Sequence, residues 1–321
     1  MKKFLSTLGA AWIFAMTVAA GFSASSQARG FAPIKYGDFD HWYTRNIKES
    51  KLLGGATRQC YAIAPDGTDN SGKAYTNRGG SPWGSSNVLA KPAGIVKVSN
   101  AVYPENRPGH GKCAKLVCQY EHCKVMGMVN LDVIAGGTIF LGQMIEPIKS
   151  TSNPYSKIDM GVPFTYRPQS LQFDYKVSIP EGGKKVYSSG FGKKKEYAGA
   201  DHAEAMVVLQ RRWEDKDGNI YAKRIGSGRQ TFGTSMAHWR NGHRMPIVYG
   251  QAGAPVPLIT GERAYYARNS KGKMKPVKEV GWEANGTPTH AIVMFSASSG
   301  EAYTGTPGLT MWVDNVGFWY E

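Results

Sequence analysis

Short apolar or alternating segments, separated by turn residues, make up most of the chain. The alternating segments include SLQFDYKVSI, AEAMVVLQRRW, HAIVMFSAS and LTMWVDNVGFWY. Few windows keep the period of 3.6 residues that an amphipathic helix needs, whereas a period of two is typical of strands. The 39 Gly and 17 Pro residues supply many turn positions between the segments. The pattern predicts an all-β chain.

The same segments predict how the strands are arranged. Alternating strands bury one face each, so they favour two antiparallel sheets packed face to face as a sandwich. The segment VVLQRRWEDKDGNIYAKR is a predicted hairpin with Asp217-Gly218 as its turn. Residues 58–123 are rich in loops and hold all four cysteines; we interpret them as an insertion or as decorated loops. No repeat or break in composition divides residues 29–321, which we treat as one domain.

The first 28 residues have the pattern of a secretory signal peptide. Lys2 and Lys3 precede an uncharged apolar run, and Ser26-Gln27-Ala28 puts small residues at the two positions that a signal peptidase reads. No cysteine follows for lipid attachment, and no later segment is apolar enough to span a bilayer. We therefore expect a mature protein that is exported to the periplasm, the outer surface or the medium, and that is not a lipoprotein.

The formal net charge of +15 bears on the expected partners. A basic protein attracts acidic polysaccharide, lipopolysaccharide, nucleic acid or a membrane surface. Many of the lysines, however, lie in turn-like runs such as EGGKKVYSSGFGKKKEY, which are typical of solvated loops. Charge alone therefore names no ligand.

Cysteine spacing favours disulfides over a metal. Cys60, Cys113, Cys118 and Cys123 are an even number, which in an exported chain predicts one or two disulfides. Zinc sites usually pair their cysteines two to four residues apart, and the spacing of five in CAKLVCQYEHC is longer. The spacing leaves the disulfide connectivity open.

Several segments resemble a known family in order and spacing. Between about Ala135 and Tyr320 the chain resembles the putative carbohydrate metabolism domain (PCMD) of gut and environmental Bacteroidetes. The last segment is the most specific, with a Ser/Gly loop ahead of a strand that contains Val313-Asp314. The segments are GGTIFLGQM, SKIDMGVPFTYRPQSLQFDYKVSIP, DHAEAMVVLQRRWED, IGSGRQTF, IVYG and HAIVMFSASSGEAYTGTPGLTMWVDNVGFWY.

The resemblance implies a jelly-roll β-sandwich, similar to carbohydrate-binding modules, in a polysaccharide-utilisation system. It implies a polysaccharide or oligosaccharide partner, neutral or anionic, and no nucleic acid. Family members often carry a lipoprotein cysteine and an immunoglobulin-like domain ahead of this one, and we identify neither in this sequence. The cysteine-rich stretch is also not a feature we associate with the family, so cell-surface anchoring is not implied.

The opening segment IKYGDFDHWYTRN resembles the first strand of jelly-roll binding modules. In those modules an early acidic residue and a late Asp meet around a structural calcium, and the matching pair here is Asp40 and Asp314. Calcium takes six to eight oxygen ligands, of which the sequence names only two. The alternative is that Asp314 caps a hydrogen-bond network at a strand edge.

Aromatic residues on loops are the candidates for stacking on sugar rings. Sugar sites combine aromatic faces with a few placed polar groups, and binding residues concentrate on loops. We expect Trp213, Trp312 and Trp319 to lie in the core, because they alternate with apolar neighbours. The glycan-binding candidates are Trp83 with Arg78 and Asn87, Trp239 with His238, and Tyr303 with Glu301.

Catalytic residues are less clearly indicated. A glycosidase needs two carboxylates across a cleft, and Asp201 and Glu204 in GADHAEAM are the first candidates. Residues three apart in one strand point to opposite faces, which weakens them as a pair, and we interpret Asp201 as structural. Neither a GxSxG elbow nor an HExxH motif is present.

Three functions are left open. The first is non-catalytic glycan recognition by an exported protein. The second is a glycoside hydrolase or lyase that acts on an acidic polysaccharide. The third is a structural or adhesion protein of the cell envelope, whose basic loops bind lipopolysaccharide or a partner protein. We favour the first, on the strand pattern, the resemblance and the loop aromatics.

Overall fold

The computed structural model describes residues 29–125, 129–190, 193–299 and 302–321. Within these residues the regular structure is β-strand apart from short 3₁₀ turns, which confirms the predicted fold class. None of the helices in this part of the chain is long and apolar enough to cross a membrane. The 3₁₀ turns are η1 (Lys51–Leu53), η2 (Pro92–Gly94), η3 (Pro154–Lys157) and η4 (Gly261–Arg263).

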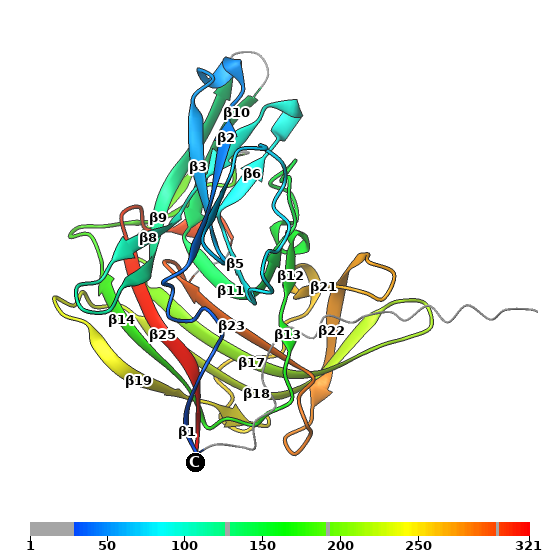
Figure 1. Ribbon diagram of the computed structural model, residues 1–321. Helices are drawn as coiled ribbons and strands as arrows, with labels where there is room; N and C mark the ends of the chain where they lie inside the picture. The colour runs from blue at the N-terminus through cyan, green and yellow to red at the C-terminus, as the bar shows by residue number, and fades with distance from the viewer. Residues whose placement is uncertain (1–28, 126–128, 191–192, 300–301) are drawn as a thin grey trace, which may run out of the picture.

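One antiparallel sheet, seven-stranded over the described residues, is built around the C-terminal strand β25. Its order is β10-β9-β25-β14-β19, with β1 paired to β25 and β8 paired to β9. Strand β1 therefore lies beside the closing strand, whereas the strand within the expected opening segment IKYGDFDHWYTRN is β2 (Trp42–Lys48), which belongs to a separate three-stranded sheet. Figure 1 shows β25, β14 and β19 side by side. The strands are β1 (Gly30–Pro33), β8 (Val102–Asn106), β9 (Lys112–Val125), β10 (Val129–Gly136), β14 (Ser170–Ser178), β19 (Arg240–Pro246) and β25 (Thr310–Tyr320).

The second sheet, ten-stranded over the same residues, faces the first. Its order is β12-β11-β23-β17-β18-β22-β21, with β5, β13 and β20 on side branches. The predicted hairpin is confirmed as β17 and β18, with Gly218 in the turn at φ 82°. The strands are β5 (Trp83–Ser85), β11 (Thr138–Met144), β12 (Ile158–Met160), β13 (Val162–Pro163), β17 (Ala203–Glu214), β18 (Ile220–Phe232), β20 (Val248–Tyr249), β21 (Tyr266–Arg268), β22 (Met274–Trp282) and β23 (His290–Ser296).

The main core lies between the two sheets. Phe173 and Val313 from the first sheet meet Val207 and Phe295 from the second in one buried cluster. The strand β17 is buried on both faces over residues 203–210, because its other side joins a second apolar cluster beneath β21 and β22. A strand covered on both faces needs no polar side, which explains the near-continuous apolar run AEAMVVLQ.

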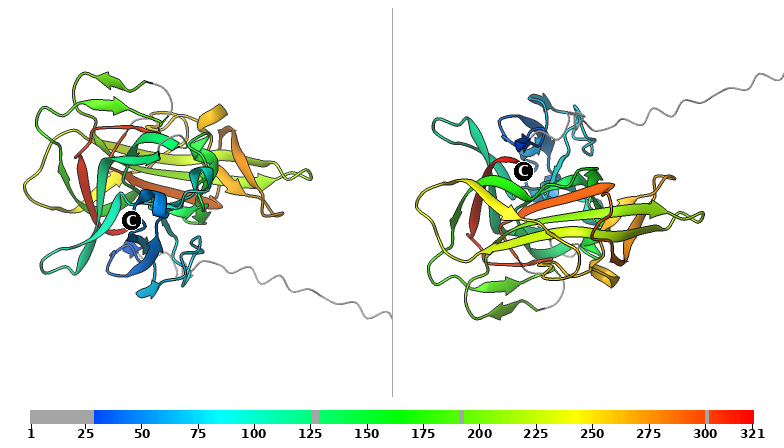
Figure 2. Two further views of the ribbon diagram at one scale, coloured as in Figure 1. Left: turned by 90° about the horizontal axis from the view of Figure 1, so that it is seen from above. Right: turned by 90° about the horizontal axis from the view of Figure 1, so that it is seen from below.

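The N-terminal strands form a lobe that projects from the sandwich (Figure 1). Residues 58–123 contribute most of this lobe, and they also supply β8 and most of β9 to the seven-stranded sheet. Figure 2 shows β25 on one side of the molecule and β22 on the other, with β17 and β18 running between them. The remaining strands are β2 (Trp42–Lys48), β3 (Thr57–Ile63), β4 (Gly67–Asp69), β6 (Val88–Ala90), β7 (Lys97–Ser99), β15 (Lys185–Tyr187), β16 (Lys195–Tyr197) and β24 (Thr304–Gly305).

The four cysteines are buried free thiols, so the structure forms none of the expected disulfides. Cys113, Cys118 and Cys123 lie on the single strand β9, where five residues span roughly 16 Å. A disulfide joins Cα atoms about 4.4–6.8 Å apart, so neighbours on this strand are too distant. Cys60 on β3 instead contacts Arg45, whose Nη2 lies 3.0 Å from its sulfur. The regular spacing belongs to one long strand and not to a set of cross-links.

Candidate functional site

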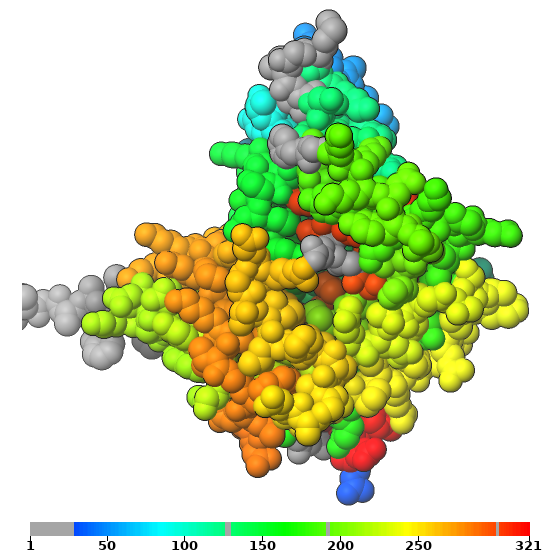
Figure 3. Space-filling view, turned by 180° about the vertical axis from the view of Figure 1, so that it is seen from behind, coloured from blue at the N-terminus to red at the C-terminus, as the bar shows by residue number. Residues whose placement is uncertain are grey.

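A cleft opens on the outer face of the ten-stranded sheet. Its volume is about 840 Å³, within the range of roughly 300–1,000 Å³ that is typical of ligand sites. Figure 3 looks into it between the yellow-orange segment near residue 260 and the green segment near residue 150. The lining is mostly apolar, and its polar side chains come from several elements.

The floor of the cleft is apolar because three strands present the same kind of side chain to it. Met206 on β17 lies opposite Met294 on β23, which in turn lies opposite Phe140 on β11. These side chains line the cleft together with Met160. Burial of a ligand's apolar face against them is favourable because it releases water.

A buried ion pair holds one wall of the cleft in place. The guanidinium of Arg224 donates to both carboxylate oxygens of Glu279, at 2.7 and 2.6 Å. Arg224 also donates to the carbonyls of Val256 and Pro257, while the amide of Ile259 donates to Glu279. The ion pair therefore connects β18 and β22 to the wall segment 256–259, which would otherwise be a long loop.

Glu204 and Arg229 form an ion pair in the lining of the cleft. They lie on the neighbouring strands β17 and β18, with Arg229 Nη2 2.8 Å from Glu204 Oε2. Burial raises the pKa of Glu204, which is 4% exposed, and Arg229 offsets part of that effect. Ser296 lies opposite Glu204 on β23, and its hydroxyl is 2.9 Å from that of Thr138. A ligand here meets a carboxylate, a guanidinium and hydroxyls beside an apolar floor.

Asp201 lies just before β17 and holds the rim of the cleft. Its carboxylate lies 3.1 Å from Lys185 Nζ and accepts from the hydroxyls of Ser298 and Ser299, each at 3.0 Å. Although burial acts to raise the pKa of Asp201, its hydrogen bond from Lys185 and the positive charge of that lysine hold it below the usual value. The pKa values of Asp201 and Glu204 thus move in opposite directions. Asp201 positions the rim, in agreement with its interpretation as structural.

Two of the glycan-binding candidates are buried structural residues. Trp83 is 3% exposed; its indole N–H donates to the Lys35 carbonyl at 3.0 Å, and its ring packs edge-on against Phe39. Asn87 is 4% exposed, and its side chain bonds backbone groups that include both the N–H and the carbonyl of Val102. Neither side chain offers a surface to a sugar, so both assignments are corrected. Trp83 was expected on a loop, but β5 pairs there with β11.

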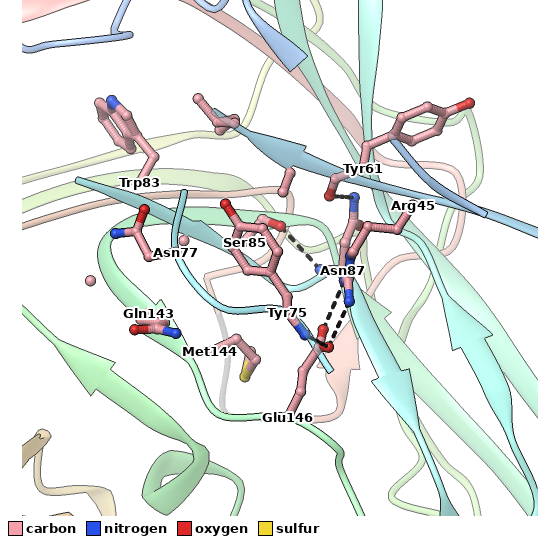
Figure 4. Close-up of a pocket in the computed structure, with 14 residues that line it drawn as sticks. Arg45, Tyr61, Tyr75, Asn77, Trp83, Ser85, Asn87, Gln143, Met144 and Glu146 are labelled. Atoms are coloured by element: carbon pink, nitrogen blue, oxygen red, sulfur yellow. Dashed lines mark hydrogen bonds and ion pairs between the residues drawn. The ribbon is translucent and has the colours of Figure 1, made fainter. Parts of the chain in front are cut away.

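A small pocket beside Trp83 is also structural. Figure 4 shows Arg45 and Glu146 at its centre, joined by two hydrogen bonds of 2.7 and 2.9 Å. Glu146 also accepts from the backbone amides of Tyr75 and Leu89. The volume of about 20 Å³ is near the size that holds one water. The ion pair of Arg45 and Glu146 connects the lobe to the residues just after β11. The pocket is too small for a sugar.

The remaining loop candidates lie in different places. Tyr303 lines the cleft, where its hydroxyl donates to the Thr151 carbonyl at 2.6 Å. Glu301, its predicted partner, lies outside the described residues. Arg78 lies over the ring of Tyr43 in the lobe, with its guanidinium carbon 5.0 Å from the ring centroid. Of these candidates, Tyr303 is the one that meets the cleft.

Trp239 and Asp314 are brought together by Arg107, which the sequence did not single out. Arg107 Nη1 lies 2.5 Å from Asp314 and 2.9 Å from Asp174, two carboxylates that face each other across β25 and β14. The guanidinium carbon lies 4.0 Å from the centroid of the Trp239 ring. His238 is exposed beside it. Arg107 lies within the turn-like segment ENRPGH, and no local pattern marks it.

Asp40 and Asp314 do not fit a shared calcium site. The Arg107 guanidinium already supplies the positive charge beside Asp314, whereas Asp40 accepts from the amide of Lys112 at 2.6 Å. In the described parts of the chain, no group of three or more His, Cys, Asp or Glu side chains is placed to hold a metal ion. Burial raises the pKa of Asp314 to about 6 against the opposing effect of Arg107, as expected when two carboxylates share one cation.

Comparison with known proteins gives one family and two solved structures. The family described as "Putative carbohydrate metabolism domain" matches residues 38–237, which includes the cysteine-containing stretch and β17. A crystal structure of a putative glycoside hydrolase from Bacteroides thetaiotaomicron VPI-5482 is similar at 17% identity, covering 87% of this chain and 71% of that one, with a TM-score of 0.47. A crystal structure of a putative glycoside hydrolase from Bacteroides vulgatus ATCC 8482 is similar at 12% identity. The match covers 92% of this chain and 96% of that one, with a TM-score of 0.40. No curated protein matches the chain.

Proposed function

The chain belongs to the family of the putative carbohydrate metabolism domain, and on that premise we propose that it is an exported protein that binds a saccharide in the cleft without cleaving it. The observation that carries the proposal is the group of Glu204, Arg229 and Ser296 in the cleft. It lies beside the apolar floor, in a cleft that Tyr303 also lines. Saccharides present both apolar C–H faces and hydroxyl edges, so a site with both kinds of surface fits them.

Binding has better support than hydrolysis because of how the acidic residues of the cleft are engaged. Glycoside hydrolysis requires two carboxyl groups that face the scissile bond from opposite sides. Among the described lining residues the acidic ones are Glu121 and Glu204. Glu204 is paired with Arg229, and Glu121 lies 3.5 Å from Lys97. Each acid already has a cationic partner, so the pair does not resemble a free acid and base.

Replacing Glu204 by glutamine tests the site. We expect Glu204→Gln to weaken saccharide binding by about tenfold or more, because a hydrogen bond to a charged group contributes about 1.5–3 kcal/mol. Isothermal titration of the mature chain with a panel of neutral and acidic oligosaccharides measures the change. Glu214→Gln is the matched control, since Glu214 lies on the same strand but is exposed at its other end.

Three outcomes would contradict the proposal. If no saccharide binds the unmodified protein, or if Glu204→Gln binds as well as the control, the cleft is not the site. If the unmodified protein releases reducing ends or unsaturated products from a polysaccharide and Glu204→Gln does not, the protein is an enzyme.

A further inference from the structure

We propose that the outer face of the seven-stranded sheet is a second binding surface, separate from the cleft, for a linear acidic polysaccharide. We call it the tryptophan face. It follows β25 along the side of the sandwich seen in Figure 1. Its tryptophans are Trp312, Trp239 and Trp319, and each has a cationic side chain over its ring.

The first part of the tryptophan face is a row across three strands. Lys115 on β9, Trp312 on β25 and Lys176 on β14 are direct cross-strand neighbours, so their side chains point to the same side of the sheet. The ammonium groups of Lys176 and Lys115 lie 4.3 and 5.6 Å from the centroid of the Trp312 ring. The indole N–H of Trp312 donates to Glu105, which also pairs with Lys115.

The far end of the face repeats this arrangement with an arginine. Arg244 on β19 lies over Trp319, with its guanidinium carbon 3.2 Å from the ring centroid, and it donates to Gln172 at 3.0 Å. Trp312 and Trp319 are seven residues apart on β25, which corresponds to roughly 20 Å along a strand. The expectation that both tryptophans lie in the core is therefore wrong: they are half-buried on the outer face.

The charges of the face favour an anionic polymer. In the middle, the single positive charge of Arg107 lies against two carboxylates, Asp174 and Asp314, so this part of the face supplies no positive charge to a ligand. Lys176 lies toward one end of the face, over the ring of Trp312. Arg244 lies toward the other end, over the ring of Trp319, and donates a hydrogen bond to the side-chain amide of Gln172. The tryptophan rings hold these long cationic side chains in place before a ligand arrives. The side chains therefore lose less conformational entropy when the ligand binds.

The shape of the face favours an extended chain over a small ligand. The two cationic ends are separated by several residues of one strand, which is longer than a single sugar unit. The outer face of the sheet is an extended surface along which successive acidic sugars can lie. We choose a polysaccharide over nucleic acid because the family is described by carbohydrate metabolism. The surface does not depend on any ligand in the cleft.

The test measures binding of the full mature chain to polygalacturonate and to uncharged dextran at low and high salt. We expect Lys176→Gln/Arg244→Gln to weaken polygalacturonate binding at low salt at least tenfold, and added salt to weaken binding by the unmodified protein. Lys271→Gln/Lys273→Gln removes the same charge from an exposed turn and should change the affinity less than twofold. Glu204→Gln should leave it unchanged, because Glu204 belongs to the cleft.

Four results would overturn the inference. They are equal loss in the two double variants, binding of dextran as tight as that of polygalacturonate, loss of binding in Glu204→Gln, and tighter binding to duplex DNA or to lipopolysaccharide vesicles than to polygalacturonate. Equal loss in the two double variants would show that binding depends only on the overall charge of the protein. Loss of binding in Glu204→Gln would place the polymer in the cleft. Failure of the cleft proposal is distinguishable, because it leaves the polygalacturonate result intact.

Discussion

Replacing Arg224 by methionine is expected to lower the free energy of unfolding by about 3–5 kcal/mol, the cost of breaking a buried ion pair. Arg224 and Glu279 are both fully buried, so the variant leaves a carboxylate in the interior without its cation. The carbonyls of Val256 and Pro257 lose their donors as well. Denaturant unfolding followed by tryptophan fluorescence measures the change. Saccharide binding should also weaken, because segment 256–259 forms a wall of the cleft.

The control for this prediction is an exposed pair on the adjacent strand. Arg211→Met breaks the contact between Arg211 and Glu283, whose side chains are 39% and 31% exposed, and should cost no more than about 1 kcal/mol. Arg224→Met/Glu279→Met should recover much of the lost stability, since it removes the unpaired charge. If the two single arginine variants lose equal stability, the ion pair does not hold the wall as described.

Replacing Arg107 by methionine is expected to lower the free energy of unfolding by about 3–5 kcal/mol at pH 8, and by less at pH 5. The variant leaves Asp174 and Asp314 facing each other in a buried position without a cation. In the folded protein the pKa of Asp314 is about 6, above its ordinary value of 3.8. At pH 5 a proton on Asp314 therefore relieves the repulsion that the variant suffers at pH 8.

The sign of the pH effect follows from this raised pKa. The contribution of Asp314 to stability is fully present below about pH 3.8 and is lost as the pH rises through about 6. Without Arg107 the folded pKa rises further, so the loss extends to higher pH. Urea unfolding of both proteins at pH 5 and pH 8 tests this, with Arg244→Met as an exposed-arginine control. An equal loss at both pH values would show that the two carboxylates are not the cause.

Local patterns predicted the strands well because neighbours in a strand obey a simple geometric rule. The alternation in LTMWVDNVGFWY corresponds to β25, where Met311, Val313 and Phe318 point into the core. Strict alternation would place Trp312 and Trp319, which are seven residues apart, on opposite faces. The register shift between β14 and β25 and the left-handed backbone at Asn315 bring both to the outer face. The alternation also does not show which face is covered, and for this reason both were expected in the core. Trp213, also expected there, is 39% exposed near the end of the hairpin and stacks on Tyr221.

The candidate site was less accessible to sequence reasoning because its residues come from distant parts of the chain. The sequence indicates Tyr303 as a glycan-binding candidate and Asp201 and Glu204 as candidate carboxylates, but nothing local indicates Arg229 or the methionine floor. Glycine neighbours suggested a loop at Trp83, although strand pairing buries it. The even number of cysteines suggested disulfides, although three of the four lie on the single strand β9 and all four are free thiols.

By itself, the sequence determined the all-β class, the hairpin of β17 and β18 and the family, because these depend on periodicity, turn residues and matched segments. Only the tertiary structure decided which charges are buried and which tryptophans are exposed. Arg107 meets Asp174 and Asp314, which are 67 and 207 residues away in the chain. The energies of such contacts depend on burial and distance. Neighbouring residues in the sequence determine neither of these quantities.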